Sequence, residues 1–266
     1  MDLELSGKCA LVTGGSRGIG RAIARQLALE GAAVALAARD ITRLTQAEAE
    51  LSAETGGRVV GVTVDTREDE SAGSAVEQAV ALLGGLDILV NAAAQPAGQS
   101  TPPRLAEVTS QAFWDDVDVK VLGYLRMARA AAPHMAAKGW GRIINISGLN
   151  ARQSGSIIGS IRNVSVAALT KNLADELGAQ GINVTVVHPG LTRTEALPDT
   201  LAYRAEAAGV SAAQIEAQLA AQVSIGRLVD AAEVANVVAF LASPKSVAIN
   251  GDAIAAGGGA RGAIYY

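Results

Sequence analysis

The sequence predicts an α/β protein: a doubly wound parallel sheet with helices on both faces. Short apolar runs alternate with longer stretches whose apolar residues recur at helical spacing, as strand–helix–strand units require. The apolar runs are continuous rather than alternating, which is typical of strands that are covered on both faces. Hydrophobic residues make up 50% of the chain and aromatic residues only 3%, a mix that suits Ala-rich helices packed on a buried sheet.

The first half of the chain contains four predicted strands and three predicted helices in strict alternation. The strands are "KCALVTG", "AAVALAAR", "RVVGVTVD" and "LDILVNAA", at residues 8–14, 32–39, 58–65 and 86–93. The helices between them are predicted at residues 18–31, 41–56 and 68–84, where apolar residues follow the helical period.

The second half continues the alternation. A long helix is predicted over 109–138 and another over 157–180, with a last helix at 230–243. Strands are predicted at 141–147, 182–190 and 250–259. The polar, Ala-rich segment 191–224 predicts a helical flap. Because no linker or shift in composition divides the chain, we expect one domain spanning 1–266.

Charge and hydropathy exclude several classes of function. A net charge of -4 argues against nucleic acid or an anionic membrane as the main partner. No apolar run approaches the roughly 18 residues that cross a bilayer, and "MDLELSGKCALVTGG" lacks a signal-peptide pattern. The single cysteine, Cys9, excludes an internal disulfide and a Cys-based zinc site, and we expect it in the core. We therefore expect a cytoplasmic protein without a metal.

The segment "TGGSRGIG" at 13–20 carries the clearest binding signal. Gly14, Gly18 and Gly20 permit a tight turn and a close approach of the backbone to a ligand. The helix that follows offers free N–H groups and the positive end of its dipole, which suit a pyrophosphate. Because the segment follows the first strand and opens the first helix, it predicts dinucleotide binding. Glycines that only help the helix to pack on the sheet are the alternative.

The end of the second predicted strand indicates which dinucleotide is bound. An acidic residue there would bind a free ribose 2′-hydroxyl, whereas Arg suits a 2′-phosphate. Ala38 stands where the acid is expected, and Arg39 follows it. Arg17 adds a second positive charge, and Asp40 is expected to cap the next helix. The sequence therefore favours NADP(H) over NAD(H), the alternative being that both arginines are ordinary solvated side chains.

These segments resemble the short-chain dehydrogenases/reductases over nearly the full chain, which implies a Rossmann domain. "TGGSRGIG" is similar to their TGxxxGxG loop, "VDT" at 64–66 to their adenine-contacting segment, and "NAAA" at 91–94 to their NNAG stretch. "HPGLTRT" at 188–194 resembles the motif whose Thr residues reach the nicotinamide amide. The resemblance implies cofactor contacts from Gly14, Ser16, Arg17, Gly18, Ile19, Gly20, Arg39, Asp65, Thr66, Asn91, Ala92, Pro189, Gly190, Thr192 and Thr194.

The resemblance breaks at the catalytic residues. In the family a Tyr protonates the substrate oxygen, a Lys one helical turn later lowers the pKa of that Tyr, a Ser holds the carbonyl oxygen, and an Asn completes a proton relay. "GRIINISG" places Ser147 at the Ser position. The register of "VAALTKNLADEL" places Gly159 at the Tyr position and Asn163 at the Lys position, and "DVKVLG" places Lys120 at the Asn position.

Lys and Asn thus look exchanged, and Ser147, Lys120 and Asn163 are the candidate catalytic residues. Because the two side chains approach each other in the family, Lys120 can return an ammonium group to the site from the opposite side. A purely structural Lys120 is the alternative. Gly159 is expected to leave a hole that water or a larger substrate fills.

Few side chains can stand in for the missing phenol. Tyr203 lies in the expected flap, and Tyr265 and Tyr266 end the chain, where C-termini of the family can approach a neighbouring subunit. Tyr124 is expected on the packed face of its helix, and His188 is expected to be structural because it ends a buried strand.

Two other polar residues have an expected role. His134 is expected on the surface of the long helix. Arg162 is expected to pair with an Asp or Glu, with binding of an anionic substrate as the alternative.

The sequence favours an atypical NADP(H)-dependent oxidoreductase that interconverts a carbonyl and an alcohol on a small organic substrate. Hydride chemistry depends on the cofactor and on orientation, so it can survive without the usual acid. An NADP(H)-binding protein with little or no redox catalysis is one alternative, and non-redox chemistry on the same scaffold is another. The resemblance also implies a homo-oligomer, a tetramer or a dimer.

Overall fold

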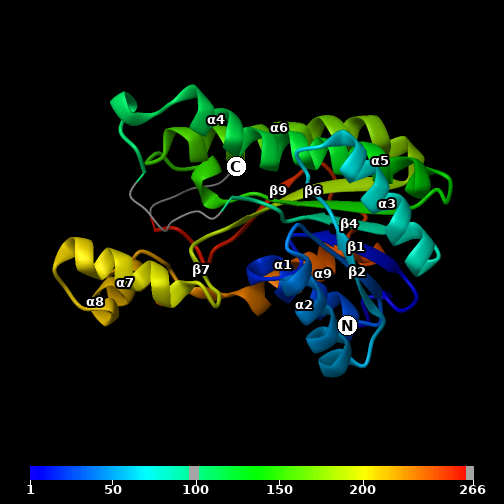
Figure 1. The fold of residues 1–266 in the computed structure, drawn as a ribbon, viewed down its shortest axis with the longest axis horizontal. Helices are drawn as coiled ribbons and strands as arrows, with labels where there is room; N and C mark the ends of the chain where they lie inside the picture. Colours follow the sequence, from blue (N-terminus) through cyan, green and yellow to red (C-terminus); the bar gives the residue numbers. More distant parts are fainter. Residues whose placement is uncertain (96–101, 262–266) are drawn as a thin grey trace.

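The computed structural model describes residues 1–95 and 102–261, and its centre is a parallel sheet of seven strands (Figure 1). The strand order is β3-β2-β1-β4-β5-β6-β9, so the chain winds outward from β1 to one edge and then from β4 to the other. This is the predicted doubly wound topology. The strands are β1 (Cys9–Thr13), β2 (Ala33–Ala38), β3 (Val59–Thr63), β4 (Ile88–Asn91), β5 (Gly141–Ile146), β6 (Ile182–Pro189) and β9 (Ala253–Ala256).

Helices cover both faces of the sheet because successive strand residues point to opposite sides. Val12 of β1 joins an apolar cluster with α1 (Gly18–Leu29), α2 (Ile41–Thr55) and α9 (Ala231–Ala242). The adjacent Leu11 joins a second cluster with α3 (Asp69–Leu83), α5 (Gly123–Ala136) and α6 (Ile157–Leu177). Cys9 belongs to this second cluster, which confirms its place in the core.

The long helix predicted over 109–138 is interrupted. It consists of α4 (Ser110–Val117), a π-helical turn over Asp118–Leu122, and α5, which ends at Ala136. Residue 123 must be small, because a Cβ on Gly123 would lie 2.9 Å from Cβ of Thr66. A π-turn places one more residue in a helical turn than the α-helix does and often marks a functional site. Here the turn contains Lys120.

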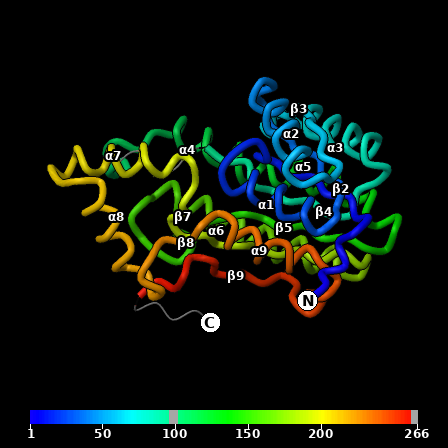
Figure 2. The backbone as a smooth tube through the Cα atoms, turned by 90° about the horizontal axis from the view of Figure 1, so that it is seen from below, coloured from blue at the N-terminus to red at the C-terminus, as the bar shows by residue number. Residues whose placement is uncertain are grey.

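The segment 191–224 holds α7 (Leu197–Ala208) and α8 (Ala212–Ala221), which share a small apolar cluster of their own. Figures 1 and 2 show both helices projecting from one end of the molecule, away from α3. A short parallel pair, β7 (Thr192–Arg193) and β8 (Val229–Asp230), lies at their base. Short 3-10 turns occur at Leu105–Glu107, Leu149–Ala151, Gly178–Gln180 and Pro244–Ser246. Over residues 1–95 and 102–261, every helix is too short or too polar to cross a bilayer.

Candidate active site

A cleft of about 1580 Å³ runs along the carboxyl ends of the central strands and under α7. In doubly wound sheets ligands bind at this edge, where the strand order reverses. The glycine loop forms one end of the cleft and Lys120 lines the other end. Of the predicted site residues, the lining includes Gly14, Ser16, Arg17, Gly18, Ile19, Gly20, Arg39, Asp65, Thr66, Ala92, Lys120, Ser147, Asn163, Pro189, Gly190, Thr192 and Thr194.

The glycine loop is shaped by contacts that leave no space for side chains. A Cβ on Gly20 would lie 2.3 Å from the carbonyl oxygen of Gly14. Gly14 itself has φ +67°, and a Cβ there would lie 3.0 Å from the backbone of Ala92. The loop therefore requires glycine at these positions, and its backbone is open to a close ligand.

The N-terminus of α1 already holds an anion from the chain itself. The N–H of Gly18 donates to Oε1 of Glu195 at 2.7 Å, across 177 positions of sequence. Arg17, at the N-cap, provides no side-chain cap of its own. Since a helix N-terminus attracts negative charge, the carboxylate of Glu195 stands where a pyrophosphate would bind.

Exposed arginines line the cleft beside the glycine loop. Within the described residues, the side chains of Arg17, Arg39 and Arg43 make no hydrogen bond or ion pair. Asp40 caps α2, as expected, by accepting from the N–H of Arg43 at 3.1 Å. Arg43 was not predicted. Its signal in the sequence is its place one helical turn after Arg39, on the first turn of α2.

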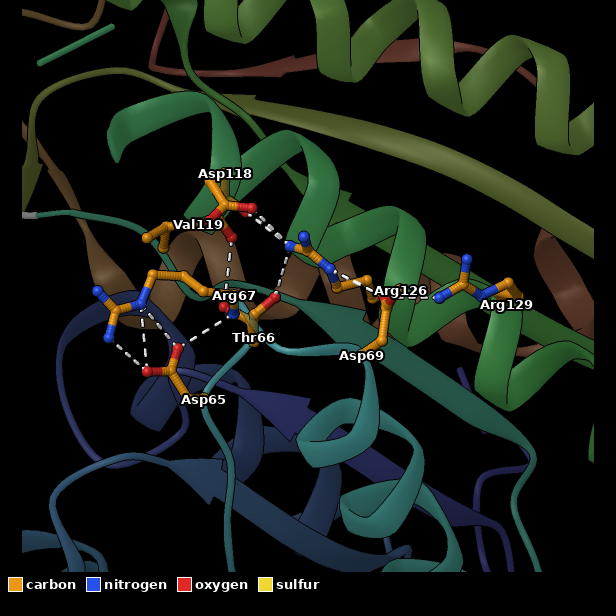
Figure 3. A network of polar contacts seen from close by, with 8 residues as sticks. All are labelled: Asp65, Thr66, Arg67, Asp69, Asp118, Val119, Arg126 and Arg129. Atoms are coloured by element: carbon orange, nitrogen blue, oxygen red, sulfur yellow. Dashed lines mark hydrogen bonds and ion pairs between the residues drawn. The ribbon is translucent and has the colours of Figure 1, made fainter. Parts of the chain in front are cut away.

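Asp65 lies on the cleft wall with its charge already paired. Its carboxylate accepts from Nη2 of Arg67 at 2.5 Å and from Nε at 3.0 Å (Figure 3). The hydrogen bond from Arg67 is the main reason why the pKa of Asp65 lies below its ordinary value. Arg67 would therefore accompany Asp65 in any contact with an adenine ring.

A second set of polar contacts ties the end of β3 to the π-turn. The hydroxyl of Thr66 donates to the carbonyl of Val119 at 3.3 Å. Nη1 of Arg126 donates both to the carbonyl of Thr66, at 3.1 Å, and to the carboxylate of Asp118, at 2.7 Å (Figure 3). These contacts fix the turn that carries Lys120.

One predicted cofactor residue lies outside the cleft lining. Asn91 is fully buried at the end of β4, and its amide donates to Oδ1 of Asn145 at 3.0 Å. Asn145 in turn donates to Thr170 of α6 at 2.9 Å. The side chain of Asn91 thus joins β4 to β5 beneath the site, and its contact with a cofactor stays a prediction.

Lys120 is buried at the other end of the cleft. It is 4% exposed, and its Nζ donates to the backbone carbonyl of Ser147 at 2.9 Å. Burial and, to a lesser degree, the positive charge of Arg162 lower the pKa of Lys120 to about 7, whereas Asp116 opposes the shift. An amine with this pKa can give and take a proton near neutral pH.

Ser147 and Asn163 lie next to Lys120, so the three candidate catalytic residues do come together. The Ser147 hydroxyl donates to the backbone carbonyl of Asn163 at 3.1 Å. Asn163 is 2% exposed, and among the described residues its Oδ1 has no hydrogen-bond partner. The site thus combines a titratable amine, a hydroxyl and an unsatisfied acceptor.

Comparisons with known proteins place this geometry in a family. Residues 14–261 match the family model described as enoyl-(acyl carrier protein) reductase. An uncharacterized oxidoreductase of Methylorubrum extorquens is 36% identical over 97% of this chain and 99% of its own length. The 3-oxoacyl-[acyl-carrier-protein] reductase of Aquifex aeolicus is 33% identical over 97% and 99% of the two chains. This chain belongs to the short-chain dehydrogenase/reductase family.

Solved structures support the same assignment. The L-sorbose reductase of Gluconobacter frateurii, complexed with NADPH and L-sorbose, superimposes with a TM-score of 0.92 at 31% identity, covering 99% of this chain and 100% of that chain. An actinorhodin polyketide ketoreductase with NADPH gives a TM-score of 0.88 at 32% identity, covering 95% and 96%. The protein is therefore an enzyme of the oxidoreductase type.

The space expected at the Tyr position of this short-chain dehydrogenase/reductase is filled. Gly159 is buried and is not part of the cleft lining. A Cβ there would lie 2.8 Å from Oγ of Ser156, which caps α6, and 3.4 Å from Nδ2 of Asn150. The expected hole at Gly159 is thus wrong, because Ser156 and Asn150 occupy it. Asn150 lines the cleft and is a site residue that the sequence did not reveal.

Among the described residues, the candidate stand-ins for the phenol, Tyr124 and Tyr203, do not line the cleft. Tyr124 is 1% exposed on the packed face, as expected, and its hydroxyl donates to the carbonyl of Ile146 at 2.9 Å. Burial raises its pKa far above the ordinary value. Tyr203 lies on α7 but not in the cleft lining, and Tyr265 and Tyr266 lie outside the described residues.

The remaining candidates are either buried or paired with a carboxylate. His188 is 1% exposed, and burial lowers its pKa to about 4, so it stays neutral near pH 7. His134 contacts Glu77 at 2.9 Å and is only partly exposed. Arg162 pairs with Asp116, as expected, through Nη1 at 2.6 Å. In the described part of the cleft, burial thus gives Lys120 a pKa close to neutral.

Proposed function

We propose that this protein is an NADP(H)-dependent oxidoreductase that interconverts a carbonyl and an alcohol on a small organic substrate, with Lys120 as the proton donor and acceptor. The observation that carries the proposal is the buried ammonium group of Lys120 beside Ser147, at the far end of a cleft that begins in a glycine loop. Relatives that are named as ketoreductases, and one complexed with NADPH and a sugar, support the reaction class.

The residues present fit a dinucleotide. The glycine loop and the N-terminus of α1 would hold the pyrophosphate, where Glu195 now accepts a hydrogen bond. The bound cofactor supplies or takes the hydride. Thr192 and Thr194, in the lining beside Pro189, would orient the nicotinamide end.

Preference for NADP(H) over NAD(H) is supported by the unpaired guanidinium groups. Arg17, Arg39 and Arg43 all line the cleft, and their side chains have no hydrogen-bond or ion-pair partner in the described residues. A guanidinium matches the geometry of a phosphate and forms charge-assisted hydrogen bonds with it. The 2′-phosphate is the group of NADP(H) that such residues would recognise.

At the reaction end, Ser147 would position the substrate oxygen and Lys120 would transfer the proton. Ser147 would turn its hydroxyl from the carbonyl of Asn163 to a substrate oxygen and hold that oxygen in place. Lys120 would then give its proton to the oxygen during reduction, or take it during oxidation. Arg162, Asp116 and His188 surround this ammonium group and set its charge balance, while burial keeps water from competing.

A pH profile tests the proposal directly. Reduction needs the protonated lysine, so kcat for NADPH-dependent reduction should fall as pH rises through about 7, and alcohol oxidation should show the opposite trend. The measurement is NADPH consumption with a panel of small aldehydes and ketones, with NADH run in parallel. Bound NADPH that no carbonyl consumes, or a profile that Lys120→Met leaves unchanged, would contradict it.

One observation favours a second function, an NADP(H)-binding protein with little redox catalysis. Ser156 and Asn150 fill the Tyr position, and the hydroxyl of Ser147 is engaged with the backbone of Asn163. If these contacts persist with substrate, nothing polarises the carbonyl. Tight NADPH binding without turnover, measured by fluorescence titration and absorbance, would select this reading.

A homo-oligomer is also proposed. The apolar side chains of Ile157, Ile161 and Val164 follow one another on the outer face of α6 and are 42%, 45% and 50% exposed. Such a stripe on a helix favours packing against a second copy. Light scattering should show an oligomer that Ile161→Glu dissociates, and a monomeric unmodified protein would overturn the proposal.

A further inference from the structure

Two cations share the reaction end of the cleft with a single paired carboxylate. Arg162 is 6% exposed, lies on α6 and lines the cleft. Its Nη1 donates to Asp116, but its Nε has no hydrogen-bond partner among the described residues. Lys120 lies near enough for the charge of Arg162 to lower its pKa. With Lys120 protonated, the group carries one positive charge in excess.

Unsatisfied polar atoms cluster at this point. The free Nε of Arg162 is a donor, and the free Oδ1 of the adjacent Asn163 is an acceptor; both residues line the cleft. Buried polar atoms in folded proteins almost always have partners, and leaving a charged group incompletely bonded is costly. A bound molecule that brings a negative charge would supply the acceptor that Nε of Arg162 lacks, whereas Oδ1 of Asn163 needs a donor such as a hydroxyl group.

The rest of the cleft at this end does not provide that charge. Asp199 and Arg204, both on α7, carry opposite charges and together add no net charge to the lining. Glu195 is held by the N–H of Gly18. Asn150 and Gln153, on the β5–α6 connection, are neutral amides. The excess of positive charge is therefore centred on Arg162 and Lys120.

We propose that the substrate is an oxo acid, or the corresponding hydroxy acid, whose carboxylate is bound by Arg162 while its carbonyl or hydroxyl group lies at Ser147 and Lys120. The inference rests on the proposed carbonyl–alcohol function and names its substrate class. A planar guanidinium binds a carboxylate through parallel hydrogen bonds, which also orients the rest of a small molecule. The side chain of Arg162 must rearrange by a small rotation to present Nε, since that atom is covered in this conformation.

The test compares acids with esters of the same carbonyl compounds. Short aliphatic α-oxo and γ-oxo acids and their methyl esters are titrated calorimetrically into the NADP⁺-loaded protein, and their kcat/KM values are measured with NADPH. A charge-assisted contact should favour the acid over its ester by about tenfold to a hundredfold. Acids that bind no more tightly than their esters would overturn the inference.

Substitutions at Arg162 and Asp116 test whether the carboxylate binds there. Arg162→Gln combined with Asp116→Asn removes both charges of the pair and keeps amides that can hydrogen-bond, so it avoids an isolated buried carboxylate. The preference for the acid over its ester, taken as the ratio of the two dissociation constants in the same variant, should disappear. Arg204→Gln, on the opposite wall, is the matched control and should keep the preference. A preference that survives in the double variant, or vanishes in Arg204→Gln, would place the carboxylate elsewhere.

The measurements distinguish a failure of the carboxylate site from a failure of the carbonyl–alcohol function. If esters are reduced as well as acids, carbonyl reduction stands and the carboxylate site falls. If no carbonyl is reduced but acids bind more tightly than esters, the site stands and the redox function falls. Should the double variant prove unstable in thermal melts, the acid–ester comparison on the unmodified protein still decides.

Discussion

The two ends of the cleft are built on different principles. At the phosphate end the binding surface is backbone, in a loop where Gly14 and Gly20 leave no space for a Cβ, and the cations beside it are exposed. At the reaction end the polar groups are buried side chains that bond to one another, such as Lys120 to Ser147. An anion of fixed shape needs one backbone geometry, whereas a proton can be moved by any suitably placed titratable group.

Burial decides what a positive charge can do at each end. Arg39 is exposed, and the planar shape of a guanidinium suits a phosphate. Lys120 is 4% exposed, and its pKa falls to about 7. The same type of charge is therefore exposed to solvent at one end and buried, with a lowered pKa, at the other. A loss of side-chain chemistry at the reaction end can thus be compensated, while a loss of glycine in the loop cannot.

The largest effect on NADPH binding is expected from a substitution in the glycine loop. Gly20→Ala would push a methyl group to 2.3 Å from the carbonyl oxygen of Gly14, so we expect NADPH binding to be lost and the melting temperature to fall. The control is Gly73→Ala on α3, where nothing lies within 4 Å of the added Cβ. That change should stabilise the protein by about 0.5–1 kcal/mol. Unchanged NADPH binding in Gly20→Ala, by calorimetry, would show that the loop is not the cofactor site.

The second effect tests the reaction end. Lys120→Met should lower kcat by about 10²–10⁴-fold, the usual contribution of a general acid, and leave NADPH affinity within about twofold. Steady-state kinetics and fluorescence titration measure the two quantities. A reduced affinity with normal kcat would instead make Lys120 a cofactor-binding residue.

Lys120→Met should also change how the stability of the folded protein depends on pH. The ordinary pKa of 10.5 holds for the unfolded chain, and the folded pKa is about 7, so the unfolded chain binds more protons between these values. The stability of the unmodified protein should therefore rise with pH across this window. Lys120→Met should be the more stable form, with a larger advantage near about pH 6 than near about pH 9 in urea titrations. An advantage independent of pH would mean that Lys120 is not buried as an ammonium group.

A smaller effect is expected for cofactor choice. Arg39→Ala should weaken NADPH binding by about tenfold to a hundredfold, because a charge-assisted contact to the 2′-phosphate is lost, and should leave NADH binding unchanged. Arg25→Ala, an exposed arginine paired with Glu54 on the same side of the sheet, is the control. Equal losses for both cofactors would argue against recognition of the 2′-phosphate.

The smallest effect concerns the carboxylate at the phosphate end. Glu195→Gln removes a negative charge that accepts from the N–H of Gly18, where it would compete with a pyrophosphate. NADPH affinity should rise by about threefold to fivefold, in line with the modest energy of an exposed charge near a helix N-terminus. Weaker binding would show instead that Glu195 helps to hold the loop in its binding shape.

The sequence by itself determined the order of strands and helices, the single glycine loop and its charged neighbours. These follow from local rules: apolar period, glycine in turns, and an Arg at the end of the second strand. It also identified Lys120, Ser147 and Asn163 through their register with the family motif. It did not reveal Asn150, because a single exposed Asn carries no pattern, and it missed Arg43, whose only signal is its spacing from Arg39.

Only the tertiary structure decided what surrounds those residues, because the deciding contacts join distant parts of the chain. The carbonyl that accepts from Lys120 lies 27 positions later, and Glu195 lies 177 positions from Gly18. Ser156 and Asn150 pack at Gly159, where a hole was expected. The side chain of Asn91 is buried below the carboxyl edge of the sheet, where it bonds to Asn145. Burial and its effect on a pKa depend on these tertiary contacts, so no local sequence pattern could predict a lysine that titrates near neutral pH.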